Sequence, residues 1–155
     1  MTGGTPGGEF SIERVTRLSP DLGEALARLM PQLSPGRPVP GEDDLAAMLA
    51  DDRLHLLVAR LGDGAIQGML SLVFYRVPTG MRARIEDVVV AEPLRGRGLG
   101  KALLVRAMQV AREAGAHVLD LTSNPSRAAA NALYVRLGFQ LWNTNVYRKV
   151  LDAAG

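Results

Sequence analysis

The stretch that decides the fold is "EDVVVAEPLRGRGLGKAL", residues 86–103. It opens with a run of valines, which favours a strand, and then passes Pro93 into three glycines at every second position, Gly96, Gly98 and Gly100. An amphipathic helical pattern follows. This order of strand, tight loop and helix leaves backbone N–H groups uncovered where the helix begins, an arrangement that binds anions.

Two nucleotide-binding motifs fit this glycine spacing poorly. A Rossmann fingerprint has Gly-x-Gly-x-x-Gly early in a βαβ unit and an acidic residue about 20 positions later, whereas here several antiparallel strands precede the glycines. A P-loop needs Ser or Thr after its lysine, but Ala102 follows Lys101. The remaining interpretations are an anion cradle made by the amides of residues 95–101, or a Gly-rich turn with solvated arginines.

The composition limits the other classes of function. The chain has 155 residues, a net charge of +2 and no cysteine, so disulfides, thiolate nucleophiles and cysteine–zinc sites are excluded. Only His55 and His117 offer imidazole groups, and we expect no metal site. We also expect no nucleic-acid partner, no membrane span and no signal peptide, and therefore a cytoplasmic location.

The periodicity predicts a mixed α/β domain. We expect a disordered tail over residues 1–9 and a single domain over residues 10–155. The Pro-rich segment 31–41 should end the first helix. Predicted strands cover residues 10–18, 54–60, 66–76, 81–90 and 117–122, with a final pair of strands or one bent strand over 139–151. The strands at 54–60, 66–76 and 81–90 should form an antiparallel meander. Predicted helices begin near residue 20 and cover 42–50, 99–114 and 126–137.

At this point the sequence resembles a family. "RGRGLG", residues 95–100, matches the Arg/Gln-x-x-Gly-x-Gly/Ala signature of the GNAT superfamily of acetyl-CoA-dependent N-acetyltransferases. "IEDVVV" before it and "ANALYVRLGF" after it, residues 85–90 and 130–139, look like the flanking family elements. The resemblance implies the GNAT fold, a mixed central sheet flanked by helices and splayed at the strand before the Gly-rich loop.

The resemblance also implies a site for acetyl-CoA as co-substrate, without a metal. The loop amides would hold the pyrophosphate, and unpaired backbone groups of the preceding strand would hold the pantetheine and the thioester carbonyl. Where many relatives have an asparagine seven residues before the helix tyrosine, this chain has Arg127, with Asn124 nearby. The expected coenzyme-binding residues are Val88, Val89, Val90, Arg95, Gly96, Arg97, Gly98, Leu99, Gly100, Lys101, Asn124 and Arg127.

By the same resemblance, Tyr134 is the candidate general acid that protonates the departing thiolate. Glu86 is the candidate general base, and Asp87 or a water chain are the alternatives. Simple strand alternation predicts that Glu86 shares a face with Val88 and Val90, with Asp87 on the opposite face.

The function expected is transfer of the acetyl group to a primary amine by direct attack on the thioester. The alternative is a non-catalytic acyl-CoA-binding sensor or interaction domain on the same fold. The acceptor, a small molecule or a peptide, would lie near residues 31–41 and 140–149. Arg37 disfavours a polycation there, while the acidic residues around 42–52 favour a cation, so the acceptor stays open. A homodimer is one assembly consistent with this function.

Overall fold

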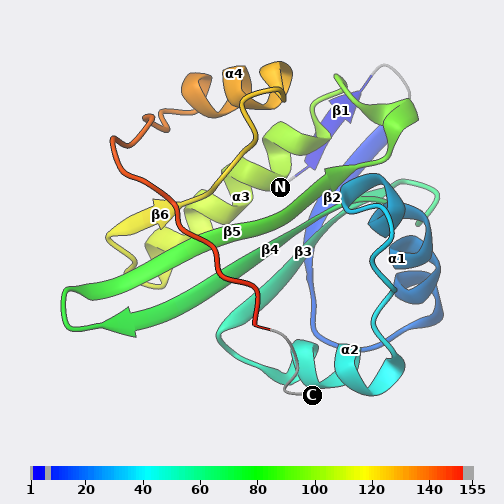
Figure 1. Ribbon diagram of the computed structural model, residues 1–155. Helices are drawn as coiled ribbons and strands as arrows, with labels where there is room; N and C mark the ends of the chain where they lie inside the picture. Colours follow the sequence, from blue (N-terminus) through cyan, green and yellow to red (C-terminus); the bar gives the residue numbers. More distant parts are fainter. Residues whose placement is uncertain (1, 6–7, 152–155) are drawn as a thin grey trace. The chain divides into compact units, whose positions relative to one another are not determined.

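The computed structural model describes residues 2–5 and 8–151, and the chain divides into two compact units, Met1–Thr122 and Ser123–Gly155. The first unit holds a six-stranded sheet in the order β1-β2-β3-β4-β5-β6 (Figure 1). Its strands are β1 (Thr2–Thr5), β2 (Gly8–Val15), β3 (Leu54–Leu61), β4 (Ile66–Val77), β5 (Gly80–Val90) and β6 (Val118–Asp120). Its helices are α1 (Pro20–Leu33), α2 (Glu42–Ala50), the short 3-10 helix η1 (Glu92–Leu94) and α3 (Leu99–Glu113). The second unit contains α4 (Ala128–Arg136).

The sheet confirms the predicted meander and the predicted splay. Strands β3, β4 and β5 are antiparallel neighbours. Strand β6 runs parallel to β5 but pairs only with Arg82–Arg84. No strand of the described residues therefore covers the outer edge of β5 from Ile85 to Val90. Apart from Val90 O, which accepts from the Arg95 side chain, this edge can hydrogen-bond an extended ligand.

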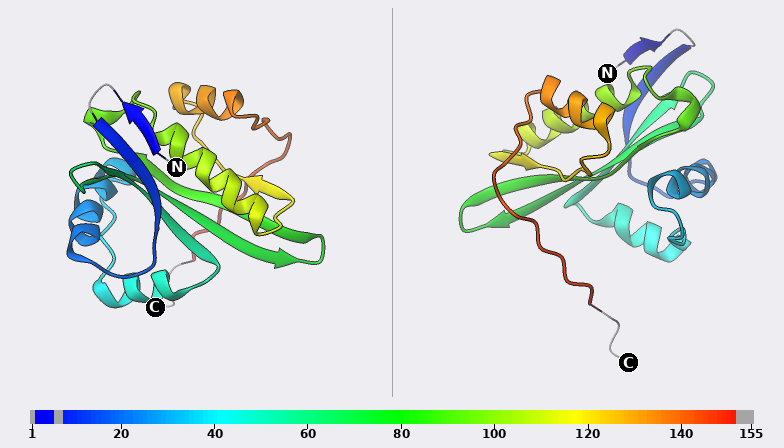
Figure 2. Two further views of the ribbon diagram at one scale, coloured as in Figure 1. Left: turned by 180° about the vertical axis from the view of Figure 1, so that it is seen from behind. Right: turned by 45° about the horizontal axis from the view of Figure 1, so that its top comes forward.

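Helices cover both faces of the sheet in the first unit (Figure 2). The apolar side of α1 and α2 packs on one face, because Leu22, Leu26 and Leu29 recur at helical spacing and form one buried cluster with Met69 and Val89. Helix α3 packs on the other face through buried residues of its own, Leu99, Leu103, Leu104, Ala107, Val110 and Ala111.

The N-terminal segment differs from the prediction of a disordered tail over residues 1–9. Residues 2–5 form β1, which pairs antiparallel with β2, and β2 begins at Gly8 rather than at Phe10. Residues 1, 6 and 7 lie outside the described residues. The Gly- and Thr-rich composition gave no strand pattern, because the backbone of β2 supplies the pairing.

Helix α1 continues past the proline that was expected to end it. Pro31 lies inside α1, which extends to Leu33. Proline removes one backbone donor, but the last turn keeps the bond from Ser34 N to Met30 O at 2.8 Å. The Gln32 side chain also donates to Arg28 O at 3.1 Å, and the last turn of α1 therefore stays helical despite Pro31.

The predicted C-terminal strands over residues 139–151 are wrong, because the structure has no strand in this segment. The alternation of apolar and polar residues is present, but a strand also needs a neighbouring backbone. Apart from Phe139, the large apolar side chains of the segment are exposed instead, Leu141 at 99%.

Candidate active site

The Gly-rich loop joins η1 to the start of α3. Gly96 and Gly98 have φ angles of 77° and 92°, in the left-handed region where a side chain is strained, and Gly98 is the N-cap of α3. Left-handed residues at alternate positions turn successive N–H groups toward the same side, which forms a concave anion site. Gly96 and Gly98 therefore serve the backbone conformation of this loop, whereas Gly100 lies within α3 and has no positive φ.

The loop amides are left without internal acceptors. Among the described residues, no backbone N–H from Gly96 to Lys101 donates to another protein group, and the helix ladder begins with Ala102 N bonding Gly98 O at 2.9 Å. Arg97 and Lys101 are exposed nearby, while Arg95 Nε donates to Val90 O at 3.1 Å and ties the loop to the end of β5. The arrangement can hold a multiply charged anion.

Strand β5 contains a bulge just before the loop. Glu86 pairs with Ser71 and Val89 pairs with Met69, so Asp87 and Val88 together face one residue of β4, Leu70. Asp87 has a φ of 52° and is the one non-glycine residue with a positive φ among the described residues. Such a conformation costs on the order of 1 kcal/mol or more and often marks a functional position.

The bulge reverses the alternation of side chains along β5. Val89 belongs to the buried cluster with α1. Its partner Met69, and Ser71 two residues further along β4, therefore lie on the face of the sheet that α1 covers. Glu86 pairs with Ser71 and lies on this same face.

Val90 lies on the opposite face of the sheet. A Cβ placed on Gly68, its partner in β4, would lie 3.2 Å from Leu103 of α3 and 3.4 Å from the Val90 side chain. The prediction that Glu86 shares a face with Val88 and Val90 is therefore wrong, because the extra residue in the bulge shifts the alternation by one.

Glu86 is held by an arginine. Arg84 Nε donates to Glu86 Oε1, and Arg84 Nη2 donates to Thr122 Oγ1 at 3.1 Å. Arg84 is also the last residue of β5 that pairs with β6. The Glu86 carboxylate is thus an ion-pair partner at the point where β5 and β6 separate.

Asp87 carries a perturbed carboxyl group. Partial desolvation and the neighbouring Glu86 carboxylate raise the pKa of Asp87 above its ordinary value of 3.8, and Arg37 acts in the opposite direction. Arg37 comes from the segment between α1 and α2. A carboxylate with a raised pKa, on a strained bulge beside an open strand edge, is suited to accept a proton.

The second unit holds the remaining predicted residues. Tyr134 is 7% exposed, and its ring packs edge-to-face on Phe139 with centroids 6.0 Å apart. Asn124 Oδ1 accepts from Ser126 N at 2.9 Å, which closes a turn before α4. Arg127 is the N-cap of α4.

Sequence reasoning missed Asn131. Its Nδ2 donates to the carbonyl oxygens of Asn124 and Arg127, each at 2.9 Å, and this clamps the turn onto the first part of α4. The one sequence signal for this role is the position of Asn131 among alanines of a predicted helix, three residues before Tyr134. A polar side chain there is expected to hydrogen-bond a nearby backbone group.

Comparison with known proteins decides the family. Residues 22–139 match the family described as "Acetyltransferase (GNAT) family". The chain belongs to the GNAT acetyltransferase family. The Gly-rich loop, the bulged β5 and α4 all lie within the matched residues of this GNAT protein.

Two curated relatives are N-acetyltransferases by name, and one similar solved structure is named a transcriptional regulator. The GNAT chain is 36% identical over 100 residues to aminoalkylphosphonate N-acetyltransferase of Salmonella typhimurium, covering 63% of this chain and 64% of that one. It is 30% identical over 148 residues to glucosamine 6-phosphate N-acetyltransferase 1 of Oryza sativa, covering 86% and 84%. A solved structure of a transcriptional regulator from Bacillus halodurans superposes with a TM-score of 0.76 at 27% identity, covering 91% and 99%.

The matches to several curated relatives are partial. The chain spans 64% of the length of the Salmonella protein and about half, 50% and 51%, of two further curated acetyltransferases that it matches. Across residues 2–5 and 8–151, the structure contains no helix of the length and apolarity that a membrane crossing requires.

Proposed function

We propose that this GNAT protein is an N-acetyltransferase that transfers the acetyl group of acetyl-CoA to a primary amine. The observation that carries the proposal is the run of unbonded amides from Gly96 to Lys101 at the start of α3, next to an uncovered strand edge. The first turn of any helix leaves its N–H groups without intrahelical partners, and here the glycines keep these groups uncovered by side chains, so that an anion can reach them. The family gives the acyl donor, and the loop supplies a place for its phosphates.

The residues present fit coenzyme A. The loop amides with Arg97 and Lys101 would bind the pyrophosphate, and the free edge of β5 at residues 88–90 would bind the extended pantetheine by backbone hydrogen bonds. Bound acetyl-CoA would supply the thioester whose carbonyl carbon the acceptor amine attacks. Asn124 and Arg127 stay predicted contacts, since their observed bonds shape the turn before α4.

The base in this proposal comes from the bulge. Glu86 was the sequence candidate and stays one, but its carboxylate is occupied by Arg84. Asp87 has no ion pair or side-chain hydrogen bond among the described residues, and its pKa is raised. We therefore favour Asp87 as the group that takes the proton from the amine, while Glu86 raises the proton affinity of Asp87.

Tyr134 completes the proposed chemistry as the proton donor. Amide formation expels a thiolate, which needs a proton, and a tyrosine hydroxyl placed near the sulfur can provide it. The fixed ring of Tyr134 supports such a role, because its packing on Phe139 restricts the direction of the hydroxyl.

The acceptor in this proposal is an amine that also carries a phosphorus oxyanion. Two relatives act, by their names, on an aminoalkylphosphonate and on glucosamine 6-phosphate, which share these two groups. The charge of Arg37 lowers the pKa of Asp87, and in this proposal Arg37 is the cation that binds the anionic end. The same family and the absence of cysteine favour direct transfer without an acyl-enzyme.

A non-catalytic sensor is the second candidate. It is favoured by the similarity to the Bacillus halodurans transcriptional regulator. A sensor needs the coenzyme site but has no use for a strained carboxylate of raised pKa beside it. We propose the cytoplasm as the place of action for either function, and the homodimer stays a prediction.

The test follows release of free thiol from acetyl-CoA. Acceptors would be 2-aminoethylphosphonate and glucosamine 6-phosphate, each paired with its analogue without phosphorus, ethylamine and glucosamine. The enzyme should turn over the phosphorus-bearing amines faster, and Tyr134→Phe should lower kcat. Tight acetyl-CoA binding without turnover of any amine would favour the sensor, and equal rates within each pair would contradict the anionic acceptor.

A further inference from the structure

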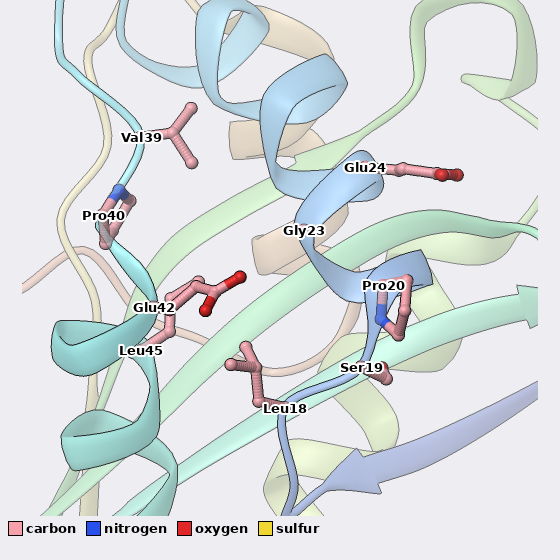
Figure 3. Close-up of a pocket in the computed structure, with 9 residues that line it drawn as sticks. All are labelled: Leu18, Ser19, Pro20, Gly23, Glu24, Val39, Pro40, Glu42 and Leu45. Carbon is pink, nitrogen blue, oxygen red and sulfur yellow. The ribbon is translucent and has the colours of Figure 1, made fainter.

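The first unit contains a cavity away from the Gly-rich loop. It has a volume of about 460 Å³ and lies between the start of α1, the end of the segment before α2, and α2 itself (Figure 3). Its apolar walls are Leu18, Pro20, Val39, Pro40 and Leu45. This volume lies within the range of small-molecule sites, which are mostly apolar with a few directed polar groups.

Exposed apolar side chains gather at this cavity. Leu18 and Val39 are each 39% exposed and both line it. Among the described residues of the first unit with assigned exposure, the other exposed large hydrophobic residues are Tyr75 and Val118, which do not line it. Paired exposed aliphatic side chains around a hollow favour binding of an apolar group.

The charged group that points into the cavity is a carboxylate. The Glu42 carboxylate points into the space between α2 and α1, whereas Glu24 on the rim points away (Figure 3). No Lys or Arg lines the cavity, and Glu42 has no ion-pair partner among the described residues. An organic cation would place its charge against Glu42 and its apolar body against the aliphatic walls.

We propose that this cavity binds an organic ammonium ion with an apolar body, at a site separate from the acetyl-transfer site. The main competing ligand is an anion, because α1 and α2 both begin beside the cavity and helix N-termini attract anions. The inward carboxylate of Glu42 disfavours that ligand. None of the residues that line the cavity belongs to the Gly-rich loop or to β5, although Val39 and Pro40 come from the segment 31–41 that was expected near the acceptor.

The test uses benzyltrimethylammonium, whose quaternary nitrogen has no lone pair and cannot be acetylated. In methyl-labelled full-length protein without acetyl-CoA, titration should shift the NMR signals of Leu18, Val39 and Leu45 in a saturable way. Benzoate, an anion of similar size, should not shift them. Glu42→Gln should weaken binding about tenfold, because it removes the coulombic attraction between the carboxylate and the ligand.

Two further variants distinguish binding inside the cavity from a general electrostatic attraction of the cation to the protein surface. Glu24→Gln removes the same charge from the rim and should leave the affinity nearly unchanged. Gly23→Leu should fill the cavity and abolish binding. A Cβ on Gly23 meets no atom within 4 Å, and leucine favours the helix, so the variant should fold, as circular dichroism would check.

Three results would overturn the proposal: no saturable shift at these methyl groups, binding of benzoate equal to that of the cation, or equal losses in Glu24→Gln and Glu42→Gln. Unchanged binding in a folded Gly23→Leu variant would contradict the location of the site. None of these outcomes depends on whether the protein transfers acetyl groups.

Discussion

The Arg84 guanidinium lies 3.1 Å from the Thr122 hydroxyl, measured from Nη2 to Oγ1, and so joins β5 to the residues after β6 where the two strands part. The same guanidinium binds Glu86 through Nε. One side chain therefore contacts both the point where the strands part and the carboxylate next to Asp87. This contact couples the geometry of the strand edge to the charge distribution of the proposed site.

Thr122→Val should weaken this junction. The substitution keeps the shape but removes the hydroxyl acceptor, and a partly exposed hydrogen bond contributes at most about 1 kcal/mol to the free energy of unfolding. Thr122→Ser retains the hydroxyl and serves as the control. Chemical denaturation of both variants measures the difference; an equal stability for Val and Ser would mean that the contact adds nothing.

Glu86→Gln and Arg37→Gln should move the pH–rate profile in opposite directions. Asp87 must be ionised to accept a proton, so activity falls as the pH drops through its raised pKa. Removing the Glu86 charge lowers the pKa of Asp87 and moves the acidic limb of kcat/KM to lower pH. Removing Arg37 raises that pKa and moves the limb to higher pH. Shifts of the same sign in both variants would exclude Asp87 as the titrating group.

His55 should make the fold sensitive to acid. Desolvation and the charge of Arg14 lower the pKa of His55 below its ordinary value of 6.5, although its bond to the Asp52 backbone opposes this. The unfolded chain then binds a proton at His55 more readily than the folded chain does. The contribution of neutral His55 to the free energy of unfolding is therefore fully present above pH 6.5 and decreases as the pH falls below that value. Unfolding measured between about pH 8 and 5 should show this loss in the wild type and a smaller one in His55→Gln. Identical pH dependence in both proteins would refute the assignment.

Asn131→Ala should loosen the turn before α4. The variant loses both bonds that clamp the carbonyl groups of Asn124 and Arg127, while alanine itself favours the helix. Amide hydrogen exchange of residues 124–130 should become faster, with little change elsewhere. Asn131→Gln is the matched control for side-chain polarity, and its longer chain should restore the protection only in part. Unchanged exchange in Asn131→Ala would show that the clamp is not needed.

Much of the fold could be predicted from local patterns. The bounds of α2, Glu42–Ala50, match the prediction, and α3 begins at Leu99 as expected because the glycine spacing marks its N-terminus. The meander followed from three apolar runs separated by turn residues. In each case the signal lies within a few residues of the element that it specifies.

The missed features depend on partners distant in sequence. The bulge at Asp87 is defined by the pairing register with β4, in which two residues of β5 face one residue of β4. No residue near Asp87 in the sequence indicates a left-handed backbone conformation. This is why the face of Glu86 was predicted wrongly. Strand β1 likewise depends on β2, and the alternating pattern of residues 139–151 did not suffice for a strand.

The loop hypothesis is tested most directly by isothermal titration of acetyl-CoA into the wild type, Gly98→Val and Gly64→Val. Gly64 is a matched control, because its φ of 91° is nearly that of Gly98, 92°, and a Cβ meets no atom within 4 Å at either position. Both variants should lose on the order of 1–2 kcal/mol of stability through left-handed strain.

Only Gly98→Val places a side chain beside the unbonded amides. We expect the wild type and Gly64→Val to bind acetyl-CoA equally, while Gly98→Val loses affinity by about tenfold or more. Absence of binding in the wild type, or equal affinity in the two folded variants, would contradict the account of the loop as the coenzyme cradle.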